Sequence, residues 1–380
     1  MAQIGRGLFA RVVLVLATAS LAACATAPTV ESGPAASGPV FYPALPNPPR
    51  IQHLKTIRGE RDLGSPESDF AKFVVGEDNR TQQLQQPYGV AVHGGKLYVV
   101  DTKMPGLAVF DLASRRFKAV TGGAGGRMKR PINITIDDDG TKYVTDTGRN
   151  QVLVFDAADQ FVQAFGAQGQ FKPVDTAVKG GRLYVADIDH HEVQVLDKRT
   201  GQTMFKFGKA GSKEGELFQP TNMAFGPEGD LYVVETGNFR VQRFTPEGRP
   251  VRMYGELGAE RGNFSRPKGI AIDREGRLYV GDSAFENVQI FDNAGRLLLF
   301  FGQPGEKQEG LNLPAGIVID YGNVGYFQAD ADPRFRIEYL IFVVSQFEPN
   351  KVDVFGFGRM AGYDYGTGEA GTATPTPVQR

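Results

Sequence analysis

Acidic side chains recur at one place in the sequence, directly after runs of the type L-Y-V-x. A ring of such carboxylates could bind a cation or transfer protons. Each acid, however, stands just before a Gly- or Asn-containing turn, so we expect it to accept hydrogen bonds from backbone or arginine donors. The column consists of Asp101, Asp146, Asp187, Glu235 and Asp282.

A second column could supply oxygen ligands. Asn133, Asp175 and Asn222 each stand two residues after a proline, at matching positions of successive repeats. Their oxygens could converge on a divalent cation such as calcium, although Asn and Asp also stabilise loops that precede strands. The chain has four histidines, and His190 and His191 share one turn, so three convergent zinc ligands cannot be assembled convincingly. We expect solvated turn residues there.

Internal repeats predict the elements that position these residues. Prolines at 87, 131, 173, 220, 267 and 314 each open the same pattern of alternating apolar residues, at spacings of 42 to 47 residues. Each unit contains four short strands separated by Gly, Asp or Asn turns, which is typical of a propeller blade. The sixth unit lacks its fourth strand, and His53 to Gly59 matches that strand. The sequence therefore predicts an all-β fold, a six-bladed β-propeller closed by its N-terminal strand.

The repeat resembles a known family. P-x-G-[VI]-A-[VI]-D, L-Y-V-x-D, N-x-[RK]-[VI]-Q-x-F and F-G, in that order, resemble the NHL repeat, over about residues 50 to 358. The arrangement is also similar to NHL-type bacterial lipoproteins, often encoded near cytochrome or respiratory components. This resemblance implies a scaffold for a protein or peptide partner. Gluconolactonase-like and amidating-lyase propellers bind metals, which leaves a metal-dependent lactonase- or lyase-like enzyme as the alternative.

The N-terminus is typical of an export signal. Arg6 and Arg11 precede a short apolar run, which is too short to span a bilayer. Leu21-Ala22-Ala23-Cys24 resembles the lipobox of bacterial lipoproteins, which implies cleavage before Cys24 and acylation of its thiol. Ala25, in place of Asp, implies sorting to the outer membrane. We therefore expect a periplasm-facing lipoprotein attached to the outer membrane through Cys24.

Loop residues that vary between repeats are the candidates for partner or ligand binding. The loops that lead into each first strand and the turns between second and third strands should share one face, which presents a polar mouth of mixed charge. The candidates there are Asn133, Arg149, Asp175, Asp189, His190, His191, Asn222, Arg240 and Lys268.

An insertion near residues 322–338 interrupts the sixth unit. It carries Tyr326, Phe327 and Phe335 and should lie on the face opposite the mouth. Long loops in compact repeat domains are commonly functional, and exposed aromatic side chains mark contact sites. The alternative is that these aromatic side chains fold back and cover the sixth blade.

Composition excludes several classes of protein. A formal net charge of −1 argues against a nucleic-acid partner, and one cysteine cannot form an internal disulfide or a metal–thiolate cluster. We expect a monomer with a signal peptide at 1–23, a flexible tether at 24–48, the propeller at 49–358 and a disordered tail at 359–380. The leading hypothesis is a non-catalytic binding scaffold without a cofactor.

Overall fold

The computed structural model describes residues 38–63, 83–305 and 310–366. The chain divides into two compact units, Met1–Gly38 and Pro39–Arg380, and the second unit contains the described elements. The predicted signal peptide, Cys24 and most of the predicted tether and tail lie outside the described residues. No helix in the described segments is long and apolar enough to cross a membrane.

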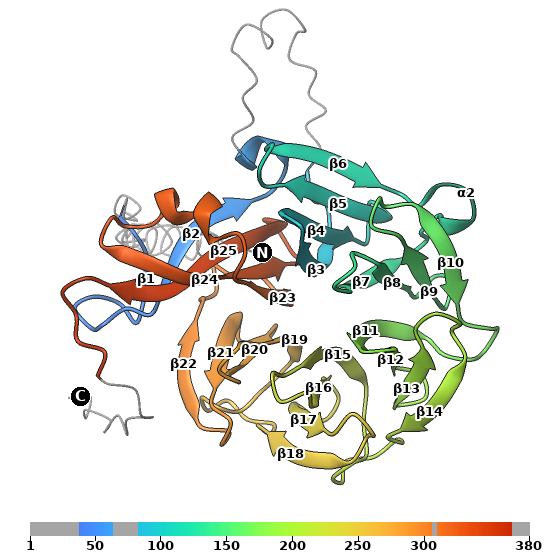
Figure 1. Ribbon diagram of the computed structural model, residues 1–380. Helices are drawn as coiled ribbons and strands as arrows, with labels where there is room; N and C mark the ends of the chain where they lie inside the picture. The colour runs from blue at the N-terminus through green and yellow to red at the C-terminus, as the bar shows by residue number, and fades with distance from the viewer. Residues whose placement is uncertain (1–37, 64–82, 306–309, 367–380) are drawn as a thin grey trace, which may run out of the picture. The chain divides into compact units, whose positions relative to one another are not determined.

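The second unit is a six-bladed β-propeller, as predicted, with the blades arranged around a central axis (Figure 1). In blades one to five the strands pair in chain order, with the first strand innermost. Blade one contains β3 (Pro87–His93), β4 (Lys96–Asp101), β5 (Gly106–Asp111) and β6 (Arg116–Val120). Blade two contains β7 (Pro131–Ile136), β8 (Lys142–Asp146), β9 (Gln151–Phe155) and β10 (Phe161–Phe165). A single turn, α2 (Gly123–Gly126), lies between these blades.

The remaining blades repeat this order. Blade three contains β11 (Pro173–Lys179), β12 (Arg182–Asp187), β13 (Glu192–Asp197) and β14 (Thr203–Phe207). Blade four contains β15 (Pro220–Phe225), β16 (Leu231–Glu235), β17 (Arg240–Phe244) and β18 (Pro250–Tyr254). Blade five contains β19 (Pro267–Ile272), β20 (Leu278–Asp282), β21 (Asn287–Phe291) and β22 (Leu297–Phe301). The first strands of the blades therefore surround the axis, namely β3, β7, β11, β15, β19 and, in blade six, β23 (Pro314–Asp320).

Blades are held together by apolar side chains from the second and third strands. Tyr98 of blade one packs with Val144 and Leu153 of blade two, and Tyr232 of blade four packs with Val280 of blade five. These tyrosine rings are almost fully buried. Burying a side chain of this size contributes about 1.5–3 kcal/mol, so the repeated column is a main source of stability.

The N-terminal strand completes blade six, as the repeat predicts. β2 (Ile51–Ile57) pairs with β25 (Lys351–Met360), next to β24 (Phe335–Ser345) and β23 (Pro314–Asp320). Two features differ from the predicted boundaries: β1 (Phe41–Tyr42), within the predicted tether, adds a fifth strand, and β25 ends two residues beyond 358. A short 3-10 helix, η1 (Glu60–Leu63), follows β2.

The insertion in blade six folds onto the sheet. It forms η2 (Val324–Tyr326) and η3 (Gln328–Asp330) between β23 and β24. Phe327 and Phe335 are buried in the core of blade six, and Phe327 contacts Phe342 edge to face. The expectation of exposed contact residues is therefore wrong for these two rings, because they cover blade six. Tyr326 remains 49% exposed.

Candidate functional site

Two faces of the propeller follow from the strand order. The mouth face is the face formed by the loops between blades and by the turns between second and third strands. The back face carries the turns between first and second strands and between third and fourth strands. All strands of a blade are antiparallel, so these loops must alternate between the faces.

The repeated carboxylates hold the mouth-face loops in place. The Asp146 carboxylate accepts hydrogen bonds from the backbone N–H groups of Lys129 (2.6 Å), Arg130 (3.0 Å), Gly148 (2.9 Å) and Arg149 (3.0 Å). Asp101 and Asp282 make equivalent bonds, and all are buried. Each acid thus joins an inter-blade loop to the following turn. The structural interpretation of this column is confirmed.

Asn133, Asp175 and Asn222 converge on one cavity of about 70 Å3 in the channel. The Asp175 Oδ2 accepts a hydrogen bond from the Met223 N–H at 2.7 Å, and the Asn133 Oδ1 accepts one from the Ile134 N–H at 3.1 Å. Among the described residues, the buried Asn222 Oδ1 has no hydrogen-bond partner. A small cation surrounded by water would fit this cavity, whereas organic ligands usually occupy about 300 Å3 or more.

Burial changes the ionisation of two groups near the channel. Desolvation raises the pKa of Asp175 to about 8, although backbone N–H groups of Met223 and Thr176 act in the opposite direction. Desolvation, with a contribution from Arg266, lowers the pKa of Lys268 to about 8. The Lys268 Nζ donates to the Gln346 Oε1 at 3.1 Å and lies 5.4 Å from the centre of the Tyr88 ring.

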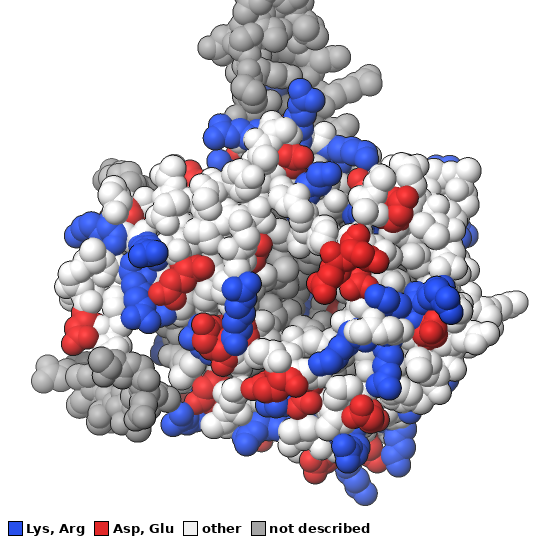
Figure 2. Space-filling view, viewed as in Figure 1, with Lys and Arg blue, Asp and Glu red and all other residues white. Residues whose placement is uncertain are grey.

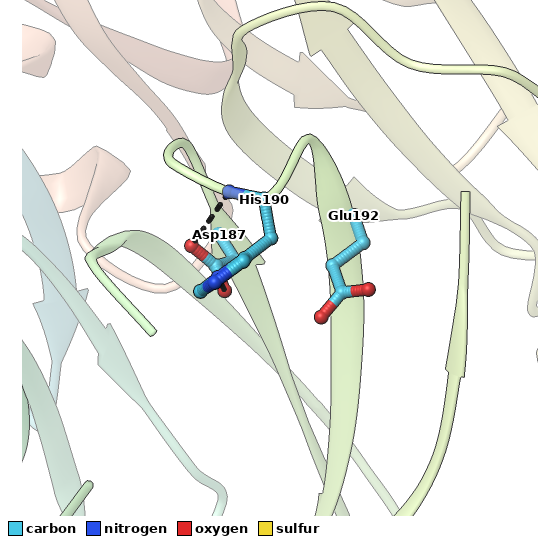
Figure 3. A group of neighbouring side chains, drawn as sticks. All are labelled: Asp187, His190 and Glu192. Carbon is cyan, nitrogen blue, oxygen red and sulfur yellow. Dashed lines mark hydrogen bonds and ion pairs between the residues drawn. The ribbon is translucent and has the colours of Figure 1, made fainter. Parts of the chain in front are cut away.

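His190 belongs to a polar cluster on blade three (Figure 3). The ligand atoms of Asp187, His190 and Glu192 lie within 4.8 Å of one another. Their oxygens, however, already contact nitrogen: the His190 Nδ1 lies 2.6 Å from the Asp187 Oδ2, and the Lys206 Nζ lies 2.7 Å from the Glu192 Oε1. The Gln194 amide also donates to both carboxylates, so a cation would have to displace these contacts.

Some of the other candidate residues on the mouth face stabilise the fold, and others are exposed to solvent. Arg240 is buried and its Nε donates to the Glu235 Oε1 at 2.6 Å, so it stabilises blade four and is not accessible to a ligand. The Arg149 Nη1 donates to the carbonyl oxygens of Gly125 and Arg127, both at 3.0 Å. Asp189 is exposed and forms an ion pair of 3.4 Å with a lysine.

His191 lies apart from His190. Its Nδ1 accepts a hydrogen bond from the Gln219 N–H at 3.1 Å, and its ring centre lies 4.8 Å from that of Phe218. The two histidines therefore have separate partners, and we find no shared ligand set for them in the described part of the chain.

Sequence reasoning missed three apolar side chains on the mouth face. Phe218 and Leu257 lie in inter-blade loops and are 39% and 63% exposed, and Phe347 lies in the turn before β25 and is 59% exposed. They occur in loops without periodicity, so only the strand order places them on one face. Figure 2 shows acidic and basic side chains interspersed around a central hollow of the molecule.

Two open hollows adjoin the loops of blades one to three on the mouth face. One, of about 530 Å3, is lined by Lys129, the turn 148–151 and the loop 166–169. The other, of about 660 Å3, is lined by Met104, Pro105 and loop residues between 121 and 128. Both are several times larger than the channel cavity, so the mouth face has more room for a ligand than the channel.

Comparisons with known proteins agree with the fold. No family model matches the chain. A match 78 positions long, which covers 18% of this chain, is 35% identical to the B-box type zinc finger protein ncl-1 of Caenorhabditis elegans, of whose length the match covers 9%. The chain thus spans about a tenth of that relative.

Solved structures with low sequence identity share the architecture. A protein of unknown function from Bacteroides thetaiotaomicron has a TM-score of 0.57 at 13% identity, with 81% of this chain and 75% of that chain covered. A gluconolactonase from Xanthomonas campestris has a TM-score of 0.53 at 15% identity, with 86% and 99% covered. A catalytically inactive virginiamycin B lyase from Staphylococcus aureus has a TM-score of 0.51 at 14% identity, with 72% and 95% covered. At these identities the likeness concerns the fold alone.

Proposed function

We propose that this chain is a non-catalytic scaffold, anchored to the outer membrane, that binds a protein or peptide partner through the mouth face. The observation that carries the proposal is that three separate loops of that face expose apolar side chains, namely Phe218, Leu257 and Phe347. Exposed aromatic and aliphatic side chains are typical of contact surfaces. The resemblance to NHL-type lipoproteins favours a component of a respiratory or cytochrome system as the partner.

The small size of the channel cavity favours binding at the mouth face over catalysis within the channel. Its cavity of about 70 Å3 is too small for a peptide or a sugar, while the hollows beside the turn 148–151 and beside Met104 are far larger. A partner loop could fill these hollows without entering the channel. Mixed surface charge fits a polar rim around such a contact.

Acidic substitutions on the mouth face should weaken partner binding. We expect Leu257→Glu with Phe347→Glu to lower crosslinking of the partner by at least about tenfold, since buried apolar anchors contribute about 1–2 kcal/mol each. The measurement is chemical crosslinking in membranes followed by mass spectrometry. Val162→Glu with Met204→Glu is the matched control, because these side chains are similarly exposed but lie on outer strands. Equal loss in both variants would contradict the proposal.

The lipid anchor is tested separately at Cys24. We expect Cys24→Ser to abolish metabolic labelling with a fatty acid, because the resemblance to lipoproteins implies that the Cys24 thiol accepts the acyl group. Ala25→Asp is the control: it should keep the label and move the chain to the inner membrane. Unchanged acyl labelling of Cys24→Ser would contradict the lipid anchor. It would not affect the proposal that a partner binds the mouth face, which is tested separately.

A second candidate function is a metal-dependent lactonase- or lyase-like enzyme. It is favoured by the unpartnered Asn222 Oδ1, which shares a cavity with Asn133 and Asp175. These oxygens suit calcium or another hard cation, with water as the remaining ligands. Elemental analysis of the purified full chain checks this candidate: about one bound cation per chain supports it, and a metal-free chain contradicts it.

A further inference from the structure

The back face of blade six carries arginines that lie close together. β24 and β25 are 11 and 10 residues long, and their paired ends extend the sheet on this face. Arg336 on β24 lies directly opposite Arg359 on β25 in the strand register. Arg50, which directly precedes β2, lies at the same end of the neighbouring strand. We call Arg50, Arg334, Arg336 and Arg359 the arginine cluster.

Acidic partners balance only part of this positive charge. Glu338 contacts both the Arg359 Nε (3.0 Å) and the Arg50 Nη2 (3.6 Å), and Asp332 contacts the Arg334 Nε (3.2 Å). Arg336 is exposed and, within the described ranges, forms no ion pair. Like charges directly opposite each other destabilise a sheet. The pair of Arg336 and Arg359 therefore destabilises blade six unless an anion lies beside it. Burial and the charges of Arg359 and Arg277 together lower the pKa of Arg50, against the opposing effect of Glu338.

The arginine cluster is accessible to a ligand. A surface hollow of about 500 Å3 is lined by Arg336, Ile337, Glu338 and Arg359. The side chains of Arg334 and Arg359 are 62% and 57% exposed. Figure 2 shows basic side chains next to acidic ones on the side of the molecule where β24 and β25 lie in Figure 1. Guanidinium groups bind phosphate oxygens in bidentate geometry, so the hollow suits a phosphate-bearing headgroup.

The start of the described chain lies beside the same sheet. The Val40 carbonyl accepts a hydrogen bond from the His53 N–H at 3.0 Å, so the segment before β1 joins the propeller at blade six. The 15 residues from 25 to 39 separate Cys24 from Val40. Fully extended, they reach at most about 50 Å, so an acyl group on Cys24 would keep blade six near the bilayer.

We propose that the arginine cluster docks on anionic phospholipid headgroups, so that the back face rests on the membrane and the mouth face points away from it. This inference rests on the proposed lipid anchor, which supplies proximity, while the arginines supply orientation. Each basic side chain near an anionic surface adds a modest attraction that depends on salt. Such an orientation would leave Phe218, Leu257 and Phe347 open to a partner.

Energy transfer to labelled lipids tests the orientation. The full chain is reconstituted through its own acyl group into vesicles of phosphatidylglycerol and phosphatidylcholine that contain an acceptor lipid. A donor dye is placed on Ala361→Cys at the back face or on Gln168→Cys at the mouth face, both exposed positions. We expect stronger transfer from position 361 in anionic vesicles, and loss of this difference in pure phosphatidylcholine or at high salt.

Charge reversal makes the test specific. Arg336→Glu with Arg359→Glu should abolish the difference between the two positions. Arg127→Glu with Arg130→Glu makes the same charge change at exposed positions of a mouth-face loop, between blades one and two, and should preserve it. Equal transfer from both positions, or a difference that persists in pure phosphatidylcholine, would overturn the proposal.

Failure of the anchor can be distinguished from failure of the docking surface. If Cys24 carries no acyl group, the unlabelled chain is added to preformed vesicles and its flotation with them is measured. The docking proposal still requires preferential flotation with phosphatidylglycerol vesicles, with about tenfold weaker binding for Arg336→Glu with Arg359→Glu. Equal flotation of this variant and the unchanged chain would overturn docking even where anchoring is absent.

Discussion

Replacing Asp353 by alanine should lower the free energy of unfolding of the propeller by about 3–5 kcal/mol, because the change removes the carboxylate that forms an ion pair with a buried lysine. The Lys351 Nζ lies 3.2 Å and 3.0 Å from the two carboxylate oxygens of Asp353, and both side chains are fully buried. The Asp353 Oδ1 also accepts a hydrogen bond from the Thr56 hydroxyl at 2.7 Å and contacts the His53 Nε2 at 3.2 Å.

These contacts join the strand that closes the ring to β25, its neighbour in the sheet of blade six. Thr56 and His53 lie on β2, whereas Asp353 and Lys351 lie on β25. Urea unfolding of the full chain measures the loss. Asp353→Leu combined with Lys351→Met removes both charges and should cost far less than the single change. Asp189→Ala, an exposed carboxylate, should change stability by less than about 0.5 kcal/mol. A loss below about 1 kcal/mol for Asp353→Ala would contradict the role of this buried pair.

Asp175 should give the propeller a stability that falls as the pH rises. Its folded pKa of about 8 lies above its ordinary value of 3.8, so the folded state holds the proton more tightly than the unfolded state. The stabilisation is fully present below about pH 4 and is lost as the pH rises through about 8, by about 6 kcal/mol at most. Asp175→Asn should remove this dependence, since the amide has no proton to lose.

Unfolding in urea at pH 5 and pH 9 tests this prediction. The unchanged chain should lose more stability between these values than Asp175→Asn, and Asp189→Asn should behave like the unchanged chain. Equal pH dependence in the unchanged chain and Asp175→Asn would contradict the burial of a protonated Asp175. A bound cation would favour the ionised carboxylate, so added calcium should remove the pH dependence only if the channel holds a metal.

Periodic features of this protein could be predicted from the sequence. The prolines and the tyrosine column repeat at blade spacing, so the six blades and the closing strand could be predicted. The structural role of the repeated acids, such as Asp146, could be predicted because each stands before a turn. The convergence of Asn133, Asp175 and Asn222 followed from their equivalent positions.

Features without periodicity could not be predicted. β1 lies in a Pro- and Ala-rich segment whose pairing depends on an edge that exists only after the ring closes. Phe327 and Phe335 are buried by tertiary packing, although their segment interrupts the repeat. Arg240 varies between repeats for a structural reason, since it compensates Glu235 in blade four. The exposure of the Leu257 side chain depends on the path of the loop between β18 and β19, which has no repeated pattern.

The central claim is that a partner binds the mouth face, and site-specific photocrosslinking tests it most directly. A photoreactive amino acid is placed at Leu257 on the mouth face or at Met204 on an outer strand, where exposure is 63% and 52%. Crosslinked products from intact membranes are then identified by mass spectrometry. We predict one protein partner joined at position 257 and not at position 204. The same products at both positions, or products at position 204 alone, would contradict a mouth-face binding site.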